Sequence, residues 1–580
     1  MKPSTNTALW IMRFGFALLV VTLGLTGARA AGIADLAVVK PVVSCQSLSS
    51  ADLSGAAGAP VTITAVKTVN LPVGAFCRVQ GNVAPTVGFE VDLPISTWQQ
   101  RFLENGCGGL CGVLIPPSVT NASTCTPALT GGLVVSSDDM GHSGISMSDG
   151  SFGTDPQKRI DFAYRGNHVT ALVSKALIKI FYGQAPRYSY FTGCSDGGRE
   201  ALVEAERFPG DFDGISAGAP AMNFVIQNSF YHAWQSDSNT RPDGTHILLA
   251  DRLPILHAAA IAACGKQERV TDGLIPDPRA CNFDPAVAEC PADASDTSSC
   301  LTAEEVAVAR KLYDGPTDEA GRPLTVGGPL PGSELAWVGL FVPRSATANL
   351  GSAGMAANTS QYVIFPDTTP ADGDIPNFPF TEANFARASI LAPLYDATDT
   401  DLSPFQEKGG KLILWQGWSD QRISPMNTIA YYQALNKQMG TAAVDSFTRL
   451  FLFPGIYHCG GGEGYTQFDL LSPLMAWVEG GDAPSRIIAA KVSLGPHVYT
   501  PPPLPQPGGT PIATRPVFAY PMVATYSGHG DVNDAASYVP VRSQMADVPA
   551  RDWEGASLYA PSFLKSYTVV DGKLTISHTK

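Results

Sequence analysis

Charged residues are scarce in this chain of 580 residues: Asp, Glu, Lys and Arg together make up only 16%. Basic residues number 38 against 52 acidic ones, and the resulting net charge of −14 excludes a broad basic surface for nucleic acid. Beyond the N-terminal segment no apolar run is long enough to span a bilayer, and the chain has no C-x-x-C pair and no internal repeat. We therefore expect neither nucleic acid nor a membrane as a partner. A hydrophobic content of 44% predicts a large buried core.

The N-terminus has the pattern of a secretory signal peptide at residues 1–30. Lys2 and Arg13 form a basic start, residues 14–27 are apolar, and Ala28-Arg29-Ala30 has the small residues of a cleavage site. A membrane anchor is the alternative, but about 14 uninterrupted apolar residues fall short of the ~20 that a spanning helix needs. Together with eleven cysteines, this leader predicts a periplasmic or secreted protein with disulfides.

Short β-rich apolar runs alternate with helical patterns from about residue 85 onwards. Residues 159–182 carry apolar side chains at helical spacing and end at Gly183, a helix stop. This alternation predicts an α/β fold with a mainly parallel sheet. The strand-like segments are residues 88–93, 132–136, 188–192, 411–415 and 448–453.

The alternation stops after residue 220 and resumes near residue 405. The interval contains four cysteines and many turn residues. An insertion of ~180 residues is domain-sized, and pockets often form where two domains meet, so we expect a lid over a site. The predicted division is residues 1–30 as signal peptide, 31–220 as the first part of the α/β domain, 221–400 as the inserted lid, and 401–580 as the second part with a C-terminal extension.

Residues 193–197 read Gly-Cys-Ser-Asp-Gly, a G-x-S-x-G motif between a predicted strand and a helical segment. In that context the motif forms a sharp turn that exposes the hydroxyl of Ser195 above the sheet. The N-terminus of the following helix directs free N–H groups toward a developing oxyanion. Such a motif arises by chance in a chain with 57 glycines, but the flanking pattern favours Ser195 as a nucleophile.

A serine nucleophile needs a general base, normally a histidine oriented by a carboxylate, and in this fold the chain order is Ser, Asp or Glu, His. His458 lies in a glycine-rich loop after the strand at 448–453, and Asp420 follows the strand at 411–415. Both positions follow strand C-terminal ends, where ligands bind in open α/β sheets. Taken alone, His458 is explained by a bond to loop backbone and Asp420 by a helix cap; their order and placement together favour a triad with Ser195.

Two cysteines are direct neighbours of these residues: Cys194 precedes the predicted nucleophile and Cys459 follows the predicted base. If Ser195 and His458 are within hydrogen-bond reach, the two cysteines are close enough to form a disulfide. That disulfide would hold the base against the nucleophile.

An oxyanion hole needs a second N–H donor besides the amide of Asp196. The candidate is the glycine-rich segment 106–112 with Gly108, because glycine lets backbone amides approach a substrate closely. A tight turn without function is the alternative.

The chain resembles the tannase and feruloyl esterase family of α/β-hydrolases, which includes mono(hydroxyethyl) terephthalate hydrolases. A Cys-Ser pair matched by a distant His-Cys pair is the most specific mark. The resemblance implies an α/β-hydrolase fold with a large inserted lid domain and a serine esterase for esters of aromatic acids, such as gallates, hydroxycinnamates or terephthalate monoesters. The matching segments are residues 106–109, 139–142, 193–199, 207–220, 331–334, 417–420 and 458–461.

The resemblance also assigns individual residues. Ser195, Asp420 and His458 take the triad positions. The implied disulfides are Cys194–Cys459, Cys45–Cys77, Cys264–Cys281 and Cys290–Cys300. Cys107, Cys111 and Cys125 then contain one pair and one free thiol, and the sequence does not say which. Residues 515–521 and 533–540 resemble segments that each carry a cysteine in the family and lack it here.

The chemistry requires no cofactor, but the family commonly carries a structural calcium ion in the lid. Gly265 stands where an aspartate is expected, and Glu268 replaces another. Because calcium prefers six to eight oxygen ligands, several of them carboxylates, the loss of one weakens the case, and an Asp-Gly turn is the alternative. The candidate metal residues are Glu268, Val270, Asp272 and Leu274.

Two other functions stay open. A hydrolase of other small esters or lactones would use the same residues, and a non-catalytic polyphenol- or carbohydrate-binding export protein would keep only the fold. Glu334 and Arg344 are candidate polar selectors of the substrate. Five lid aromatics would suit a planar acid, although the lid core is the commoner place for such side chains: Trp234, Trp337, Phe341, Tyr362 and Phe365.

Overall fold

The computed structural model describes residues 32–114, 119–265, 270, 272–365, 378–492 and 510–577. The predicted signal peptide, residues 1–30, lies outside these ranges. In the ranges described, no helix combines the length and the apolar character that crossing a bilayer requires.

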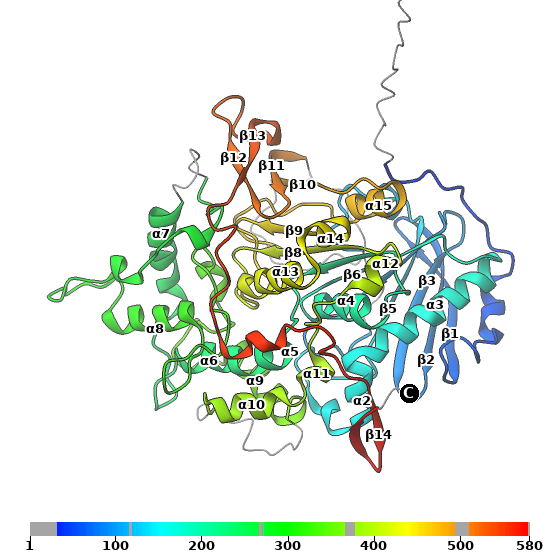
Figure 1. Ribbon diagram of the computed structural model, residues 1–580, viewed down its shortest axis with the longest axis horizontal. Coiled ribbons are helices and arrows are strands. Elements are labelled where there is room, and N and C mark those ends of the chain that lie inside the picture. Colours follow the sequence, from blue (N-terminus) through cyan, green and yellow to red (C-terminus); the bar gives the residue numbers. More distant parts are fainter. Residues whose placement is uncertain are drawn as a thin grey trace, which may run out of the picture.

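A nine-stranded sheet runs through the centre of the molecule in the order β1-β2-β3-β5-β4-β6-β7-β8-β9 (Figure 1). Neighbours from β1 to β5 pair antiparallel, and from β5 to β9 every pair is parallel. This is the mainly parallel α/β sheet that the sequence predicts. The strands are β1 (Val61–Leu71), β2 (Gly74–Val83), β3 (Val87–Pro94), β4 (Arg101–Asn105), β5 (Leu133–Asp138), β6 (Tyr188–Cys194), β7 (Gly214–Gly218), β8 (Lys411–Gly417) and β9 (Thr448–Phe453).

Both faces of the parallel part are buried, because successive strand residues point to opposite sides. Phe102 and Phe191 belong to a core cluster with α3, α4 and α13, whereas their neighbours Leu103 and Tyr190 belong to a cluster with α15. The helices therefore cover the sheet on two sides. They are α3 (Gly166–Tyr182), α4 (Asp196–Arg207), α13 (Pro425–Met439) and α15 (Leu471–Gly480), with the shorter α1 (Thr126–Leu129) and α14 (Thr441–Phe447).

The helix predicted over residues 159–182 is interrupted near its start. It consists of α2 (Pro156–Ile160), a π-helical turn (Asp161–Arg165) and α3. It ends at Gly183, whose φ of 75° is the left-handed conformation that glycine adopts readily at helix ends.

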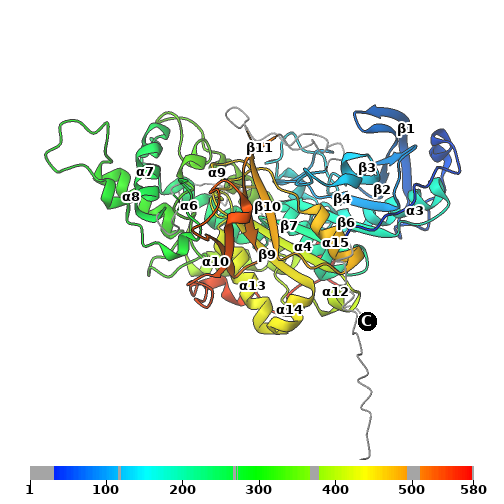
Figure 2. The ribbon, with the colours of Figure 1, turned by 90° about the horizontal axis from the view of Figure 1, so that it is seen from above.

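Between β7 and β8 the described chain adds no strand to the sheet and forms a group of helices at one end of it. Figure 2 shows α6 to α9 at this end and β1 to β3 at the other. Buried residues between Leu248 and Val342 form a core cluster around Trp337 that includes no residue of the sheet. The interval corresponds to the predicted insertion at 221–400, and its action as a lid stays a prediction. The helices are α5 (Phe224–Ile226), α6 (His232–Asp237), α7 (Leu253–Cys264), α8 (Ala303–Asp314), α9 (Gly351–Tyr362), α10 (Glu382–Ser389), α11 (Ala392–Tyr395) and α12 (Ser403–Glu407).

The C-terminal region forms three two-stranded antiparallel pairs. Two of them, β10–β11 and β12–β13, lie together above β8 and β9 in Figure 1. A bridge between Phe451 and Ala519 joins this region to the β9 edge of the central sheet. The strands are β10 (Arg486–Val492), β11 (Pro511–Phe518), β12 (Met522–Tyr526), β13 (Tyr538–Arg542), β14 (Tyr567–Val570) and β15 (Lys573–Ile576).

Ten cysteines form five disulfides. Four pairs are those that the family resemblance implied, namely Cys45–Cys77, Cys194–Cys459, Cys264–Cys281 and Cys290–Cys300. The fifth is Cys107–Cys111, which leaves Cys125 as a buried thiol. Burial raises the pKa of Cys125 to about 12, so this thiol stays protonated and unreactive at neutral pH.

Candidate active site

Ser195 lies in the turn between β6 and α4 with φ 67° and ψ −121°. Such a conformation is strained for a residue with a side chain and occurs mainly at functional sites. A Cβ at Gly193 would lie 2.2 Å from the carbonyl oxygen of Gly197, and a Cβ at Gly197 would lie 2.7 Å from that of Cys107. The turn therefore requires glycine on both sides of Ser195.

The loops after β8 and β9 bring Asp420 and His458 together. Nδ1 of His458 lies 2.9 Å from Oδ2 of Asp420, at hydrogen-bonding distance. Gln416 donates to the same oxygen at 2.7 Å, while Oδ1 accepts from the amides of Arg422 at 2.8 Å and Ile423 at 3.0 Å. Because Asp420 is fully buried and held by four donors, it fixes the orientation of the imidazole.

A disulfide joins the serine turn to the histidine loop. The Cα atoms of Cys194 and Cys459 are 5.8 Å apart although the residues are separated by 265 positions. Ser195 and His458, their direct neighbours, line one cavity. A hydrogen bond between the serine hydroxyl and the imidazole is not among the contacts of the described residues; in free enzymes this bond often tightens only when substrate binds.

Two backbone amides beside Ser195 are available to an oxyanion. Gly108 and Asp196 both line the cavity, and in the described part of the chain neither amide has a hydrogen-bond acceptor. The side chain of Asp196 is engaged elsewhere, since Nε of the buried Arg199 lies 2.6 Å from its carboxylate. This pairing compensates a negative charge that would otherwise oppose a developing oxyanion.

The segment that contains Gly108 is supported by a buried carboxyl group. Oε2 of Glu200 accepts hydrogen bonds from the amide of Cys107 at 3.2 Å and from Asn167 at 3.0 Å. Burial raises the pKa of Glu200 well above its usual range, and the charge of Asp196 adds to the effect. Burial therefore favours the protonated form of Glu200, in which it shapes the segment as a neutral group.

The cavity in front of Ser195 has a volume of about 700 Å³, within the roughly 300–1,000 Å³ of typical small-molecule sites. The insertion contributes Gln227, Asn228, His232 and Met355 to its wall, and Met147 comes from the loop after β5. The wall is thus mainly apolar with several polar groups, and its two flexible thioethers adapt readily to planar ligands.

The predicted selectors of the substrate lie elsewhere. Among the described residues that line the cavity there is neither Glu334 nor Arg344, and none of the five lid aromatics. Glu334 is buried and forms hydrogen bonds with His257 and Tyr313, and Trp337 lies in the core of the insertion. These side chains stabilise the insertion and do not contact a ligand in the cavity.

The sequence patterns did not single out Glu200 or Arg422. Glu200 has the appearance of an ordinary charged residue in a helix, and Arg422 that of a surface residue after a strand. No local pattern distinguishes them, because their environments depend on segments distant in the chain. The one local signal for Arg422 is its position in the sequence, two residues after the predicted triad residue Asp420.

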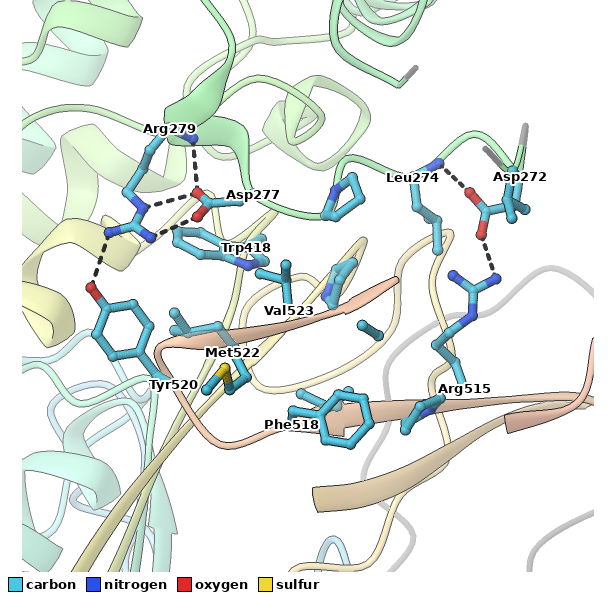
Figure 3. A pocket seen from close by; sticks show the side chains of 17 residues that line it. Asp272, Leu274, Asp277, Arg279, Trp418, Arg515, Phe518, Tyr520, Met522 and Val523 are labelled. Carbon is cyan, nitrogen blue, oxygen red and sulfur yellow. Dashed lines mark hydrogen bonds and ion pairs between the residues drawn. The ribbon is translucent and has the colours of Figure 1, made fainter. Parts of the chain in front are cut away.

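The loop in which the family resemblance implied calcium lies against the C-terminal strands (Figure 3). Oδ2 of Asp272 accepts a hydrogen bond from Arg515 at 2.8 Å, and Oδ1 accepts from the amide of Leu274 at 3.1 Å. Glu268 lies outside the described residues, and Val270 lines a small pocket beside Asp272. Gly265 in place of an acid and the pairing of Asp272 with a permanent cation both weigh against a calcium ion in this loop.

The same guanidinium stacks on two aromatic rings. Its carbon lies 4.1 Å from the ring centre of Tyr538 and 4.9 Å from that of Tyr465. Arg515 and Tyr538 belong to the two C-terminal segments in which the family has a cysteine and this chain has none. A cation–π contact thus joins segments for which the resemblance implied the loss of a disulfide.

Comparison with known proteins agrees with this geometry. A sequence model described as tannase and feruloyl esterase matches residues 70–541. An uncharacterized esterase from Xanthomonas campestris pv. campestris is 34% identical, over 89% of this chain and 92% of that protein. A mono(2-hydroxyethyl) terephthalate hydrolase from Piscinibacter sakaiensis is 31% identical, over 80% of this chain and 84% of that protein.

Solved structures show the same architecture. Feruloyl esterase B from Aspergillus oryzae superimposes with a TM-score of 0.70 at 28% identity, covering 83% of this chain and 97% of that one. A tannin acyl hydrolase from Aspergillus niger, at 20% identity, has a TM-score of 0.63 over 84% of this chain and 92% of its own. These similarities confirm the predicted α/β-hydrolase fold.

Proposed function

Because the chain belongs to the tannase and feruloyl esterase family and is an ester hydrolase, we propose that it cleaves esters of aromatic acids through an acyl-enzyme on Ser195. The observation that carries this proposal is the pairing of His458 with the buried Asp420 at the cavity that Ser195 lines. The Cys194–Cys459 disulfide supports it, since it keeps the serine turn and the histidine loop together.

The proposed mechanism is two-step acyl transfer. His458 removes the proton of Ser195, and the alkoxide attacks the ester carbonyl. The amides of Gly108 and Asp196 stabilise the oxyanion, where each such donor contributes roughly a hundred- to a thousand-fold in rate. His458 then protonates the leaving alcohol, and a water molecule repeats the sequence on the acyl-enzyme to release the acid. Asp420 holds the imidazole tautomer and stabilises the imidazolium.

The proposed acyl groups are aromatic acids of the gallate, hydroxycinnamate or terephthalate monoester type. Relatives named as feruloyl esterases and as a mono(2-hydroxyethyl) terephthalate hydrolase support this range. The cavity is large enough for an aromatic ring and a small alcohol. Met147 and Met355 offer thioether contacts to such a ring, worth up to about 1.5 kcal/mol each.

We further propose that the protein acts outside the cytoplasm. The leader pattern at residues 1–30 and the five disulfides support this location, because disulfides form and persist in oxidising compartments. Neither a cofactor nor a macromolecular partner takes part in the proposed reaction.

Labelling with a fluorophosphonate tests the nucleophile. The wild-type protein is expected to take up one label at Ser195, and Ser195→Ala is expected to take up none while its melting temperature stays the same.

Turnover of methyl gallate, methyl ferulate and monomethyl terephthalate should fall at least about a thousand-fold in that variant. Retained turnover would remove Ser195 from the mechanism, and a wild-type protein that neither labels nor hydrolyses would favour a binding protein. Faster turnover of a short p-nitrophenyl ester than of all three would favour a general hydrolase.

A further inference from the structure

Arg422 brings a positive charge into the cavity next to the candidate triad. It lies between β8 and α13 and lines the cavity together with Ser195 and His458. Its backbone serves the triad, since the amide donates to Asp420 at 2.8 Å and the carbonyl accepts from Gln227 at 2.5 Å. These contacts involve the main chain alone and leave the role of the guanidinium open.

The guanidinium of Arg422 has neither a hydrogen bond nor an ion pair to any residue that the structure describes. The side chain is exposed to solvent inside the cavity. Nearby protein lowers the pKa of Arg422 by desolvation, and the charge of Asp420 acts against this shift. Arginine remains charged even so. A charged guanidinium without a protein partner is free to form charge-assisted hydrogen bonds to a bound anion.

Three buried arginines of this chain have carboxylate partners. Arg101 pairs with Glu479 at 2.6 Å, Arg199 with Asp196 at 2.6 Å and Arg279 with Asp277 at 2.6 Å. These guanidinium groups are thus matched by a protein carboxylate. Arg422 has no such partner among the described residues and lies where the cavity is open to a ligand.

The acidic groups at the cavity are not available to Arg422. Asp420 is engaged by His458 and three further donors, and Asp196 is engaged by Arg199. Asp138 accepts the amide of Met140 at 2.7 Å, and burial raises its pKa to about 7. No acidic side chain of the described cavity wall forms an ion pair with Arg422, although the charge of Asp420 acts on it from nearby.

Among the described residues that line the cavity, Arg422 is the only lysine or arginine. His232 also lines it, but burial, with a smaller contribution from the charge of Arg422, lowers the pKa of His232 to about 3. This histidine is therefore neutral at physiological pH. Arg422 is the charged donor that an anionic group in the cavity would meet.

We propose that Arg422 binds a carboxylate of the substrate, so that the preferred ester carries a second, ionised acid group. This inference rests on the proposed esterase function and narrows its substrate class. A guanidinium binds a carboxylate through two parallel hydrogen bonds, which gives orientation as well as affinity. The carboxylate belongs either to the acyl half, as in a monoester of an aromatic diacid, or to the alcohol half, as in an aromatic acid esterified to a hydroxy acid.

Matched ester pairs test the proposal and separate the two sources. Monomethyl terephthalate is compared with its neutral isostere methyl 4-carbamoylbenzoate, and a hydroxycinnamoyl ester of a hydroxy acid with the methyl ester of the same compound. The wild-type enzyme is expected to prefer the charged member of one pair by at least about tenfold in kcat/KM. The pair that shows the preference identifies which half of the substrate carries the carboxylate.

Variants of Arg422 are expected to lose the preference for the charged ester, mainly because the KM for that ester rises. Arg422→Gln should lower kcat/KM roughly ten- to a hundred-fold more for the charged ester than for its neutral partner. Arg422→Lys should keep part of the preference, because it retains the charge but loses the paired hydrogen bonds. Arg344→Gln is the matched control, since Arg344 is exposed and does not line the cavity, and it should behave as wild type.

Equal rates on both members of both pairs in the wild type, or an unchanged ratio in Arg422→Gln, would overturn the proposal. If no ester is hydrolysed by the wild type, the proposed function fails instead. Should Arg422→Gln not fold, calorimetry with the folded Ser195→Ala variant decides: the charged ester of the preferred pair must bind at least about tenfold tighter than its neutral partner, and increasingly so at low salt. Equal binding there would again overturn the role of Arg422.

Discussion

Nδ1 of His458 lies 2.9 Å from Oδ2 of Asp420, a carboxylate that also accepts hydrogen bonds from Gln416 and from two backbone amides. The imidazole is thereby held through Nδ1, and in the proposed mechanism Nε2 is the nitrogen that exchanges a proton with Ser195. The backbone amides and the buried glutamine keep the aspartate in place whether or not a ligand is bound. Each group around this pair leads to a measurable expectation.

Replacing Asp420 by asparagine should abolish most of the activity without unfolding the protein. An amide neither stabilises the imidazolium nor favours the required tautomer, so we expect kcat to fall by about ten-thousand-fold. The measurement is steady-state turnover of the preferred ester, with Asp445→Asn on the exposed surface of α14 as control. A variant within about tenfold of wild type would show that the carboxylate does not assist catalysis.

The Cys194–Cys459 disulfide should support stability and turnover together. Because it closes a loop of 265 residues, its replacement by two alanines is expected to cost up to about 5 kcal/mol. Replacing Cys290 and Cys300, which close only 10 residues in the insertion, should cost about 3 kcal/mol and leave kcat unchanged. Wild-type kcat in the first double variant would contradict the positioning role of that disulfide.

Glu200 should be replaceable by glutamine but not by alanine. Burial raises its pKa well above the usual range, so glutamine reproduces the neutral acid in size and in its acceptor for the Cys107 amide. Alanine leaves that amide unsatisfied at a cost of about 1–3 kcal/mol. We expect near-normal kcat in Glu200→Gln and a reduced kcat in Glu200→Ala. The reverse ranking would mean that the carboxylate acts in its charged form.

Chelation of calcium should not change the stability of the protein. Arg515 pairs with Asp272 and stacks on Tyr538, so the cation of this loop is part of the chain. The melting temperature is expected to be the same in EGTA and in calcium chloride, whereas Arg515→Ala should lose about 2 kcal/mol. A fall of about 5 °C in EGTA that calcium reverses would contradict this assignment.

The stability of the fold should depend on pH through Asp396. This side chain accepts the amide of Val225, and burial raises its pKa from 3.8 to about 8. The folded state therefore binds the proton more tightly than the unfolded state, so this stabilising contribution is complete below about pH 4 and declines until about pH 8. Asp396→Asn should match wild type in melting temperature near pH 4 and exceed it near pH 8. Parallel curves would show that Asp396 does not titrate in this window.

Much of the central sheet was predictable because buried strands are continuous apolar runs. The five predicted segments are β3, β5, β6, β8 and β9. β7 was missed because Gly-Ile-Ser-Ala-Gly contains only one large apolar residue. β1 and β2 were missed because their faces are partly exposed and carry polar residues, so their apolar pattern is weak.

The candidate site was predictable where its signals are local. Ser195 stands in a motif of five residues, and the cysteines beside Ser195 and His458 connect two distant segments. The environment of a side chain is different, because it depends on contacts between residues far apart in sequence. Asp272 bonds to Arg515, which is 243 positions away in the sequence, and the amide of Cys107 bonds to Glu200, which is 93 positions away. No pattern within any of these segments predicts such contacts.

The covalent link between the serine turn and the histidine loop also connects activity with biosynthesis. Under the proposed export, a newly made chain in the reducing cytosol would lack this bond between its reactive groups. Oxidation after export would then complete the enzyme. The chain would stay dormant inside the cell that produces it, without a propeptide or an inhibitor, and would spare that cell's own esters.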